Sequence, residues 1–274
     1  TLFRSGDDIT DDRGLTLIGP NSPEPTADDG LDEDRDGVVD DTDQDRLIDN
    51  TRIFFMPEDD AEVVIEGLTL TGGRPKTAED AGFGGAILSS GPLIVRDSLF
   101  AGNSTAELPG LGGAITSSSQ GGVLTIENSI FSGNSAYLGG AISAGFGDSP
   151  LAIRDSEFLG NLAIGSNFDS GGGAIFGGYT ILQSSQVIEN VATDGAFFQG
   201  GPLFVIDSFI EKNETISDDN LGTAAIDAGF LSLVRSSVVD NVGGAVSAEL
   251  AVVTSSTIAD NVTIGQTSRG PFDS

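Results

Sequence analysis

The chain has 274 residues, enough for one elongated domain or two compact ones, and its hydrophobic content of 38% excludes a disordered protein. Its 42 acidic and 12 basic residues give a net charge of −30, which disfavours binding to nucleic acid and to anionic membranes. Cysteine and histidine are both absent, which excludes disulfides, thiolate metal sites and a histidine ligand or general base.

Residues 27–49 form an acidic insertion near the N-terminus, in which 11 of the 22 residues from 28 onward are Asp or Glu. Oxygen-bearing residues recur there with the spacing of an EF-hand calcium loop, and Gly37 occupies the position of the sharp turn. The sequence therefore predicts a bound Ca²⁺, with the ligands Asp32, Asp34, Asp36, the backbone carbonyl of Val38, Asp40 and Asp43.

Two features separate this loop from an EF-hand. The last ligand position holds Asp43 where an EF-hand has a bidentate Glu, and Pro23 and Pro25 precede the loop where a helix would stand. We therefore expect the loop without the flanking helices. The alternative interpretation is a solvated acidic run, in which close carboxylates repel one another and bind nothing.

A repeat centred on an Asn occupies most of the chain after residue 90. A Ser precedes each Asn by five residues, and large apolar residues precede it by three and by eight. A third apolar residue usually precedes it by ten, with Thr180 and Ala251 as the weak members. The seven Ser and Asn pairs are Ser98 and Asn103, Ser129 and Asn134, Ser156 and Asn161, Ser185 and Asn190, Ser208 and Asn213, Ser236 and Asn241, and Ser256 and Asn261.

Each repeat contains three short apolar runs, which predict three short strands. The positions ten and eight before the Asn alternate as in a strand, and the Phe-x-x-Asn segment forms a second run. The third is Gly-Gly-Ala-Ile, seen at 84–87, 112–115, 139–142 and 172–175 and decayed at 223–226 and 243–246. With a degenerate repeat at 63–70, this pattern predicts an all-β parallel β-helix of about eight coils as a single domain over 1–274. A compact β-sandwich, the alternative, does not explain a sevenfold Ser column.

The repeated residues have physical roles in such a stack, where equivalent positions lie about 4.8 Å apart. Columns of Phe, Val and Ile fill the interior, and stacked Asn and Ser side chains form ladders of hydrogen bonds from coil to coil. We expect the Asn itself to occupy the left-handed backbone region at a bend, because Asn tolerates that conformation. The paired Gly residues permit positive φ or a close approach to the next coil.

The connectors that follow the Asn residues vary in length and are longest at 104–111, 162–171 and 214–222. Long loops gathered on one side of a repeat protein often bind a ligand. Unselected variation in loop length is the alternative. The candidate binding residues in these loops are Leu108, Leu111, Phe168, Asp169, Asp218 and Asp219.

The position six before each Asn is a candidate catalytic column, because it holds Asp97, Asp155 and Asp207. Two carboxylates on adjacent coils would suit glycoside hydrolysis. Asp97 and Asp155 are separated by a coil with Asn128, however, and exposed Asp residues are common in turns. We therefore expect a protein that is not an enzyme.

The Phe-x-x-Asn and Gly-Gly-Ala-Ile segments resemble the repeats of polymorphic outer-membrane proteins and autotransporter passengers, which are bacterial secreted proteins with right-handed parallel β-helix repeats. The resemblance spans residues 63–263, and it implies that residues 15–20 and 52–55 form opening coils. The acidic loop, with Asp at its last ligand position, resembles those of thrombospondin type 3 and dockerin modules. Proteins with this fold include adhesins, structural surface proteins and polysaccharide-cleaving enzymes.

These observations predict an extracellular or cell-surface protein that is adhesive or structural, such as a building block of a surface layer or fibre, and is stabilised by Ca²⁺. The expected partners are other copies of the chain, joined end to end or laterally, or a surface carbohydrate or protein. Neither nucleic acid nor direct membrane insertion is expected, since no run reaches the length of a membrane span. A polysaccharide lyase or hydrolase and a calcium-dependent carbohydrate-binding module are the alternatives.

Overall fold

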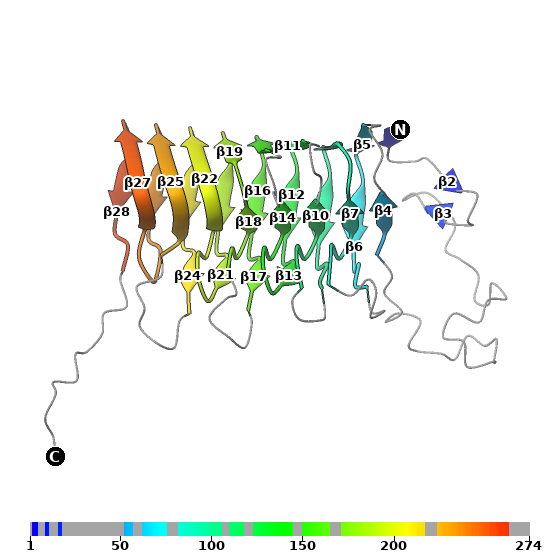
Figure 1. Ribbon diagram of the computed structural model, residues 1–274, viewed down its shortest axis with the longest axis horizontal. Helices are drawn as coiled ribbons and strands as arrows, with labels where there is room; N and C mark the ends of the chain where they lie inside the picture. The colour runs from blue at the N-terminus through cyan, green and yellow to red at the C-terminus, as the bar shows by residue number, and fades with distance from the viewer. Residues whose placement is uncertain are drawn as a thin grey trace, which may run out of the picture.

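The computed structural model describes residues 52–56, 62–75, 82–105, 110–117, 123–144, 150–164, 171–216 and 224–262, and the backbone of three short strands at 2–4, 9–10 and 16–17. From residue 52 onward its strands stack into a parallel β-helix, and Figure 1 shows them side by side along the long axis of the molecule. The predicted fold class is therefore confirmed. No helix among the described residues is long and apolar enough to cross a membrane.

Each coil contributes one strand to each of several families of strands that pair in parallel. The first family, which contains the Gly-Gly-Ala-Ile segments, is β4 (Phe54–Met56), β7 (Ile87–Ser89), β10 (Ile115–Ser117), β14 (Ile142–Ala144) and β18 (Ile175–Gly177). The second family is β5 (Val63–Glu66), β8 (Leu93–Arg96), β11 (Leu124–Glu127), β15 (Leu151–Arg154) and β19 (Thr180–Gln183).

The third family precedes the Asn residues and continues through the whole stack. It consists of β6 (Thr69–Thr71), β9 (Leu99–Ala101), β12 (Ile130–Ser132), β16 (Glu157–Leu159), β20 (Gln186–Ile188), β23 (Phe209–Glu211), β26 (Ser237–Val239) and β28 (Thr257–Ala259). A fourth family of two-residue strands, which the sequence pattern did not predict, follows the Asn residues. It consists of β13 (Ser135–Ala136), β17 (Leu162–Ala163), β21 (Val191–Ala192) and β24 (Glu214–Thr215).

The first and second families merge in the C-terminal coils. Strand β22 (Phe198–Ile206) pairs with β18 through its first residues and with β19 through its last ones, and β25 (Ile226–Val234) and β27 (Val246–Thr254) continue it. These coils have no connector between the two families, because each of the three nine-residue strands continues from one family into the other.

The N-terminal strands agree with the sequence prediction only in part. β1 (Leu2–Arg4) pairs in parallel with β5, and β4 pairs with β7, so residues 52–55 belong to an opening coil as expected. β3 (Thr16–Leu17), by contrast, pairs antiparallel with β2 (Ile9–Thr10) in a separate two-stranded sheet. The expectation that residues 15–20 form a coil of the parallel stack is therefore wrong.

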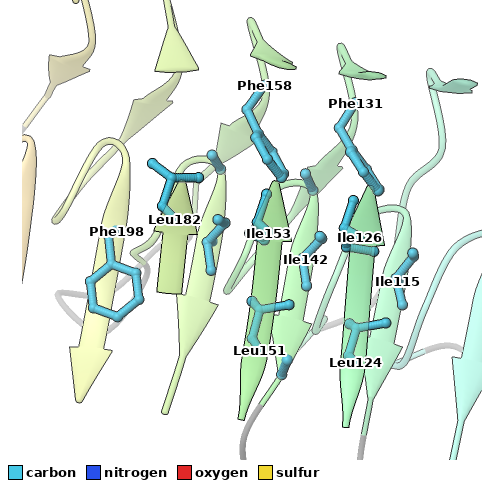
Figure 2. Packing of buried hydrophobic residues seen from close by; sticks show 14 of the residues in the cluster. Ile115, Leu124, Ile126, Phe131, Ile142, Leu151, Ile153, Phe158, Leu182 and Phe198 are labelled. Carbon is cyan, nitrogen blue, oxygen red and sulfur yellow. The ribbon is translucent and has the colours of Figure 1, made fainter. Parts of the chain in front are cut away.

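The core is a set of apolar columns that run along the stack. The rings of Phe100, Phe131 and Phe158 are parallel, with centroids 4.7 and 5.0 Å apart, and all three side chains are fully buried. Figure 2 shows Phe131 and Phe158 of this column beside Ile126, Ile153 and other aliphatic residues. Because equivalent residues pair in register, each apolar column excludes water along its length.

The bends of each coil depend on a left-handed residue, but this residue is not the Asn. Positive φ occurs one residue before each ladder Asn and one residue before each ladder Ser, as at Gly133 and Asn128. The residues concerned include Asp240 before Asn241, and even Lys212 and Arg235, which are unusual in this conformation. This corrects the expectation that the ladder Asn itself is left-handed. The Asn follows the turn, and its side chain is directed into the stack.

The paired Gly residues have two separate functions. Gly112 has a φ of 59°, and it is the first of its pair. The second residue, Gly113, is required for close approach, since a Cβ there would lie 2.1 Å from the carbonyl oxygen of Gly140. The same contact recurs at Gly85 and Gly140, so the backbones of successive coils touch along this column.

Candidate functional site

A buried ladder of Asn side chains runs along the stack from Asn103 to Asn261. In each step, the Oδ1 of one Asn accepts hydrogen bonds from the backbone N–H and the Nδ2 of the Asn in the preceding coil, as between Asn134 and Asn161 at 3.0 and 2.9 Å. The Nδ2 of Asn134 also donates to the carbonyl of Phe100. Because six of the seven Asn residues are fully buried, each of these polar atoms depends on its partner in the next coil.

A second ladder joins the Ser residues. Each hydroxyl donates to the carbonyl two residues earlier in its own coil and accepts from the backbone N–H of the Ser in the preceding coil. The hydroxyl of Ser156, for example, donates to Arg154 at 2.7 Å and accepts from Ser129 at 3.1 Å. A small side chain with one donor and one acceptor therefore satisfies two buried backbone groups.

Both ladders have the same direction. Every Ser and Asn presents its side-chain oxygen to the coil before it and its backbone N–H to the coil after it. Both ladders begin at one coil, where the N–H groups of Leu68 and Gly73 donate to Ser98 and Asn103. Leu68 and Gly73 have no side-chain oxygen, so neither ladder extends past this coil toward the N-terminus.

The predicted calcium loop lies outside the described residues, as do five of the six candidate residues of the connectors. These residues are Asp32, Asp34, Asp36, Val38, Asp40 and Asp43 of the loop, and Leu108, Phe168, Asp169, Asp218 and Asp219 of the connectors. Within the described ranges no group of three or more His, Cys, Asp or Glu residues is arranged to hold a metal ion. Calcium binding therefore remains a prediction.

Leu111, the remaining connector candidate, is part of the stack. Its side chain is buried, and its backbone forms parallel bridges with Phe83 and Leu138 of the neighbouring coils. The expectation that Leu111 belongs to a projecting binding loop is therefore corrected. The physical reason is that this residue begins the return of the chain into the first strand family, directly before Gly112.

The residues six places before the ladder Asn residues lie in turns. Some of them form polar contacts with the residue at the same position in a neighbouring coil. Asn128 donates to Asp97, and Arg235 forms two hydrogen bonds of 2.7 Å with the carboxylate of Asp207. The hydrogen bond with Arg235 lowers the pKa of Asp207 below its usual value, which is the opposite of what a general acid requires. The column is thus explained by its left-handed turns and its pairing between coils.

The outer face of the second strand family is charged in the N-terminal coils. Glu66, Arg96, Glu127 and Arg154 follow one another in register, with charges that alternate in sign. The Nε of Arg96 lies 2.8 Å from the Oε2 of Glu127. Opposite charges across neighbouring strands stabilise the sheet modestly and keep this face solvated.

The same face becomes apolar in the four C-terminal coils, and we call this region the C-terminal apolar face. Tyr179, Leu250 and Val252 are 42%, 60% and 49% exposed. Its aromatic side chains lie in a row, with the ring of Phe204 5.1 Å from that of Tyr179 and 5.5 Å from that of Phe230. The face comprises Tyr179, Ile181, Pro202, Phe204, Ile206, Phe230, Val234, Leu250 and Val252.

Exposed apolar patches of this kind usually mark binding surfaces, because water contact with them is unfavourable. The sequence analysis missed this face, although a signal was available. Its residues stand seven, nine and eleven places before the ladder Asn residues. The N-terminal coils carry Arg96, Glu127 and Arg154 at the first of these positions, and Thr125 and Ala152 at the second.

Comparison with known proteins gives one match, to the Chlamydia polymorphic membrane protein repeat, over residues 128–145. This segment contains Phe131-x-x-Asn134 and Gly139-Gly140-Ala141-Ile142, so the predicted resemblance to this repeat is confirmed for one coil. In the structure it comprises β12, β13 and β14, together with the Asn134 step of the ladder. No curated protein and no solved structure matches the chain. The chain is therefore similar, in this coil, to the repeats of a bacterial membrane protein family.

Proposed function

We propose that this protein is a surface-exposed, non-catalytic β-helix that adheres to an uncharged polysaccharide through the C-terminal apolar face. The single observation that carries the proposal is the row of exposed and partly exposed aromatic and aliphatic side chains on four successive coils. The repeat match supports the surface location, because the matching family is one of membrane proteins.

The arrangement of the aromatic rings supports a sugar polymer as the ligand. The rings follow one another at 5.1 and 5.5 Å along the stack, which is comparable with the length of one pyranose residue. A polysaccharide that runs parallel to the axis can therefore place the apolar face of a sugar ring against each aromatic ring. The tilts of 38° and 49° between neighbouring rings leave room for the substituents of successive sugars.

The charge of the molecule supports an uncharged ligand. A net charge of −30 repels acidic polysaccharides and other copies of the same chain at long range. Polar groups in register with residues of the face, among them Gln183 beside Ile206 and Ser232 beside Phe204, are positioned to bond sugar hydroxyls. An adhesive scaffold of this kind requires a rigid surface, which the continuous ladders provide.

The proposal is tested by binding of the full chain to uncharged polysaccharides, such as β-glucans and dextran, in affinity electrophoresis. The double substitution Tyr179→Ser with Phe230→Ser is expected to abolish retardation, while Phe209→Ser serves as the matched control. Phe209 is an aromatic residue of the third family that is 57% exposed away from this face. Equal retardation of the two variants, or release of reducing ends from the polysaccharide, would contradict the proposal.

A further inference from the structure

We propose that the C-terminal apolar face selects polysaccharides whose sugars are joined by equatorial 1,4 bonds, as in polymers of β-1,4-linked glucose or N-acetylglucosamine. This inference rests on the proposed function, and it names the class of polymer that the same face binds. It depends on which of two neighbouring columns of outward-facing residues carries the aromatic ring in each coil.

The two columns run side by side along the outer face of the second strand family, through three successive coils. The register of the strands defines them, because residues that pair between coils belong to the same column. The first column is Tyr179, Pro202 and Phe230, and the second column is Ile181, Phe204 and Ser232.

The aromatic ring changes column from one coil to the next. It belongs to the first column at Tyr179, to the second at Phe204 and to the first again at Phe230. The centroids of neighbouring rings are nevertheless only 5.1 and 5.5 Å apart, so the three rings form one continuous zigzag row. In each coil, the column that lacks the aromatic ring holds a smaller side chain, which is Ile181, Pro202 and Ser232 in turn.

A polymer with equatorial 1,4 bonds alternates in the same way. Each sugar is turned by half a rotation relative to the sugar before it, so the bulky exocyclic groups project to opposite sides in turn. In glucose and N-acetylglucosamine, axial C–H groups cover both faces of the pyranose, and either face can therefore pack on an aromatic ring. The zigzag row gives each sugar a ring to stack on and, beside that ring, a smaller residue that leaves space for the exocyclic group.

The spacing of the coils favours the same class of polymer. Successive coils lie about 4.8 Å apart, and an extended polymer with equatorial 1,4 bonds advances by nearly one pyranose length per sugar. Axial bonds and 1,3 bonds curve the polymer into a helix, which carries successive sugars away from a straight row. A 1,6 bond adds a rotatable bond per sugar, and ordering it on binding costs affinity. The net charge of −30 disfavours acidic members of the class.

The test measures binding of four uncharged tetrasaccharides to the full chain by calorimetric titration. Two of them, the β-1,4-linked tetramers of glucose and of N-acetylglucosamine, belong to the proposed class, and comparison of the two shows which sugar the face prefers. The β-1,3-linked and α-1,4-linked glucose tetramers have the same size without the alternation. We expect at least one β-1,4-linked tetramer to bind about tenfold more tightly than either of these.

An exchange of two side chains tests the zigzag arrangement itself. Phe204→Ser with Ser232→Phe keeps the composition of the face but moves the middle ring one coil along its column, which breaks the alternation. We expect this variant to unfold at the same temperature and to lose the preference among the tetramers. Phe209→Ser, outside the face, should keep the preference.

The possible failures are distinguishable. Equal binding of all four tetramers that is lost in the variant Tyr179→Ser with Phe230→Ser would overturn the selection and leave the proposed function standing. Absence of binding to any sugar would overturn both. An unchanged preference in the exchange variant would show that the zigzag row does not select the polymer. Self-association of the chain that this exchange abolishes, measured by sedimentation, would assign the row to a second copy instead.

Discussion

Asn134 donates its backbone N–H and its side-chain Nδ2–H to a single oxygen, the Oδ1 of Asn161, at 3.0 and 2.9 Å. Asn161 in turn makes the same two bonds to Asn190. A buried side chain that is both donor and acceptor in this way holds three coils together, and its replacement affects all three.

The substitution Asn161→Ala is expected to destabilise the fold strongly. It leaves the backbone N–H and one Nδ2–H of Asn134 without an acceptor in a dry environment, and it removes the side-chain donor to the Phe131 carbonyl. Each unsatisfied buried group costs about 1–3 kcal/mol. Asn261→Ala removes the acceptor of the same two donors on Asn241, but this step is only partly buried, so water can replace the lost oxygen and the substitution should cost much less. Thermal and urea unfolding of the two variants measure the difference, and equal losses of stability would contradict the expectation that a buried step of the ladder costs more to break than a partly exposed one.

Gly residues that touch the backbone of the next coil and Gly residues that precede a ladder Asn should differ in their tolerance of substitution. Gly113→Ala is expected to destabilise by about 1–3 kcal/mol, because its Cβ would lie 2.1 Å from a backbone oxygen and the coils must separate. Gly133→Asn should be nearly neutral, since no atom lies within 4 Å of its Cβ position and Asn tolerates a φ of 62°. Urea unfolding compares the two, and a greater loss for Gly133→Asn would contradict the assignment.

The Arg235–Asp207 pair predicts that the stability of the folded state depends on pH in the acidic range. The hydrogen bond and charge of Arg235 lower the pKa of the Asp207 carboxyl, so the pair stabilises the folded state above the ordinary Asp pKa and loses this effect as pH falls through the lowered value. In Arg235→Gln the pKa should rise toward the ordinary value. Carboxyl titration by NMR measures it, and an unchanged Asp207 pKa would exclude the ion pair in solution.

Removal of calcium is predicted to lower thermal stability, because a ligand that binds only the folded state stabilises it by an amount that grows with the logarithm of the ligand concentration above Kd. Calorimetric titration should detect binding at sub-millimolar Ca²⁺, and Asp34→Ala with Asp36→Ala should abolish it. Glu24→Ala with Asp29→Ala removes the same charge outside the predicted ligand set and is the matched control. Absence of binding at several millimolar Ca²⁺ would leave the insertion as a solvated acidic segment.

The sequence predicted the coils because the ladder positions accept very few side chains. A fully buried position that must donate twice and accept twice selects Asn, and a narrow bend that must bond both ways selects Ser. The apolar columns were predictable for a similar reason, since every coil buries the same positions. These constraints recur at each step, so seven repeats made the pattern unmistakable.

Other features depend on the backbone, and the side chains gave little indication of them. The two-residue strand Ser135–Ala136 pairs through its peptide groups, and its counterparts include Leu162 and Glu214. The left-handed position before the Asn holds Gly133 in one coil and Lys212 in another. The first strand of the coil at 195–198 was missed because Gly-Ala-Phe-Phe replaces Gly-Gly-Ala-Ile there.

The ladders also determine how the molecule responds to force. Each coil bonds only to its two neighbours, so tension applied along the axis is carried by one layer of Asn, Ser and strand hydrogen bonds at a time. When the chain is pulled at Asn261, the coil of this residue detaches first, and the next layer then bears the full load. Successive Asn residues are separated by 20, 28, 23, 29, 27 and 31 residues from this end. A single molecule pulled from its C-terminal coil therefore lengthens in unequal steps whose sizes reproduce that order.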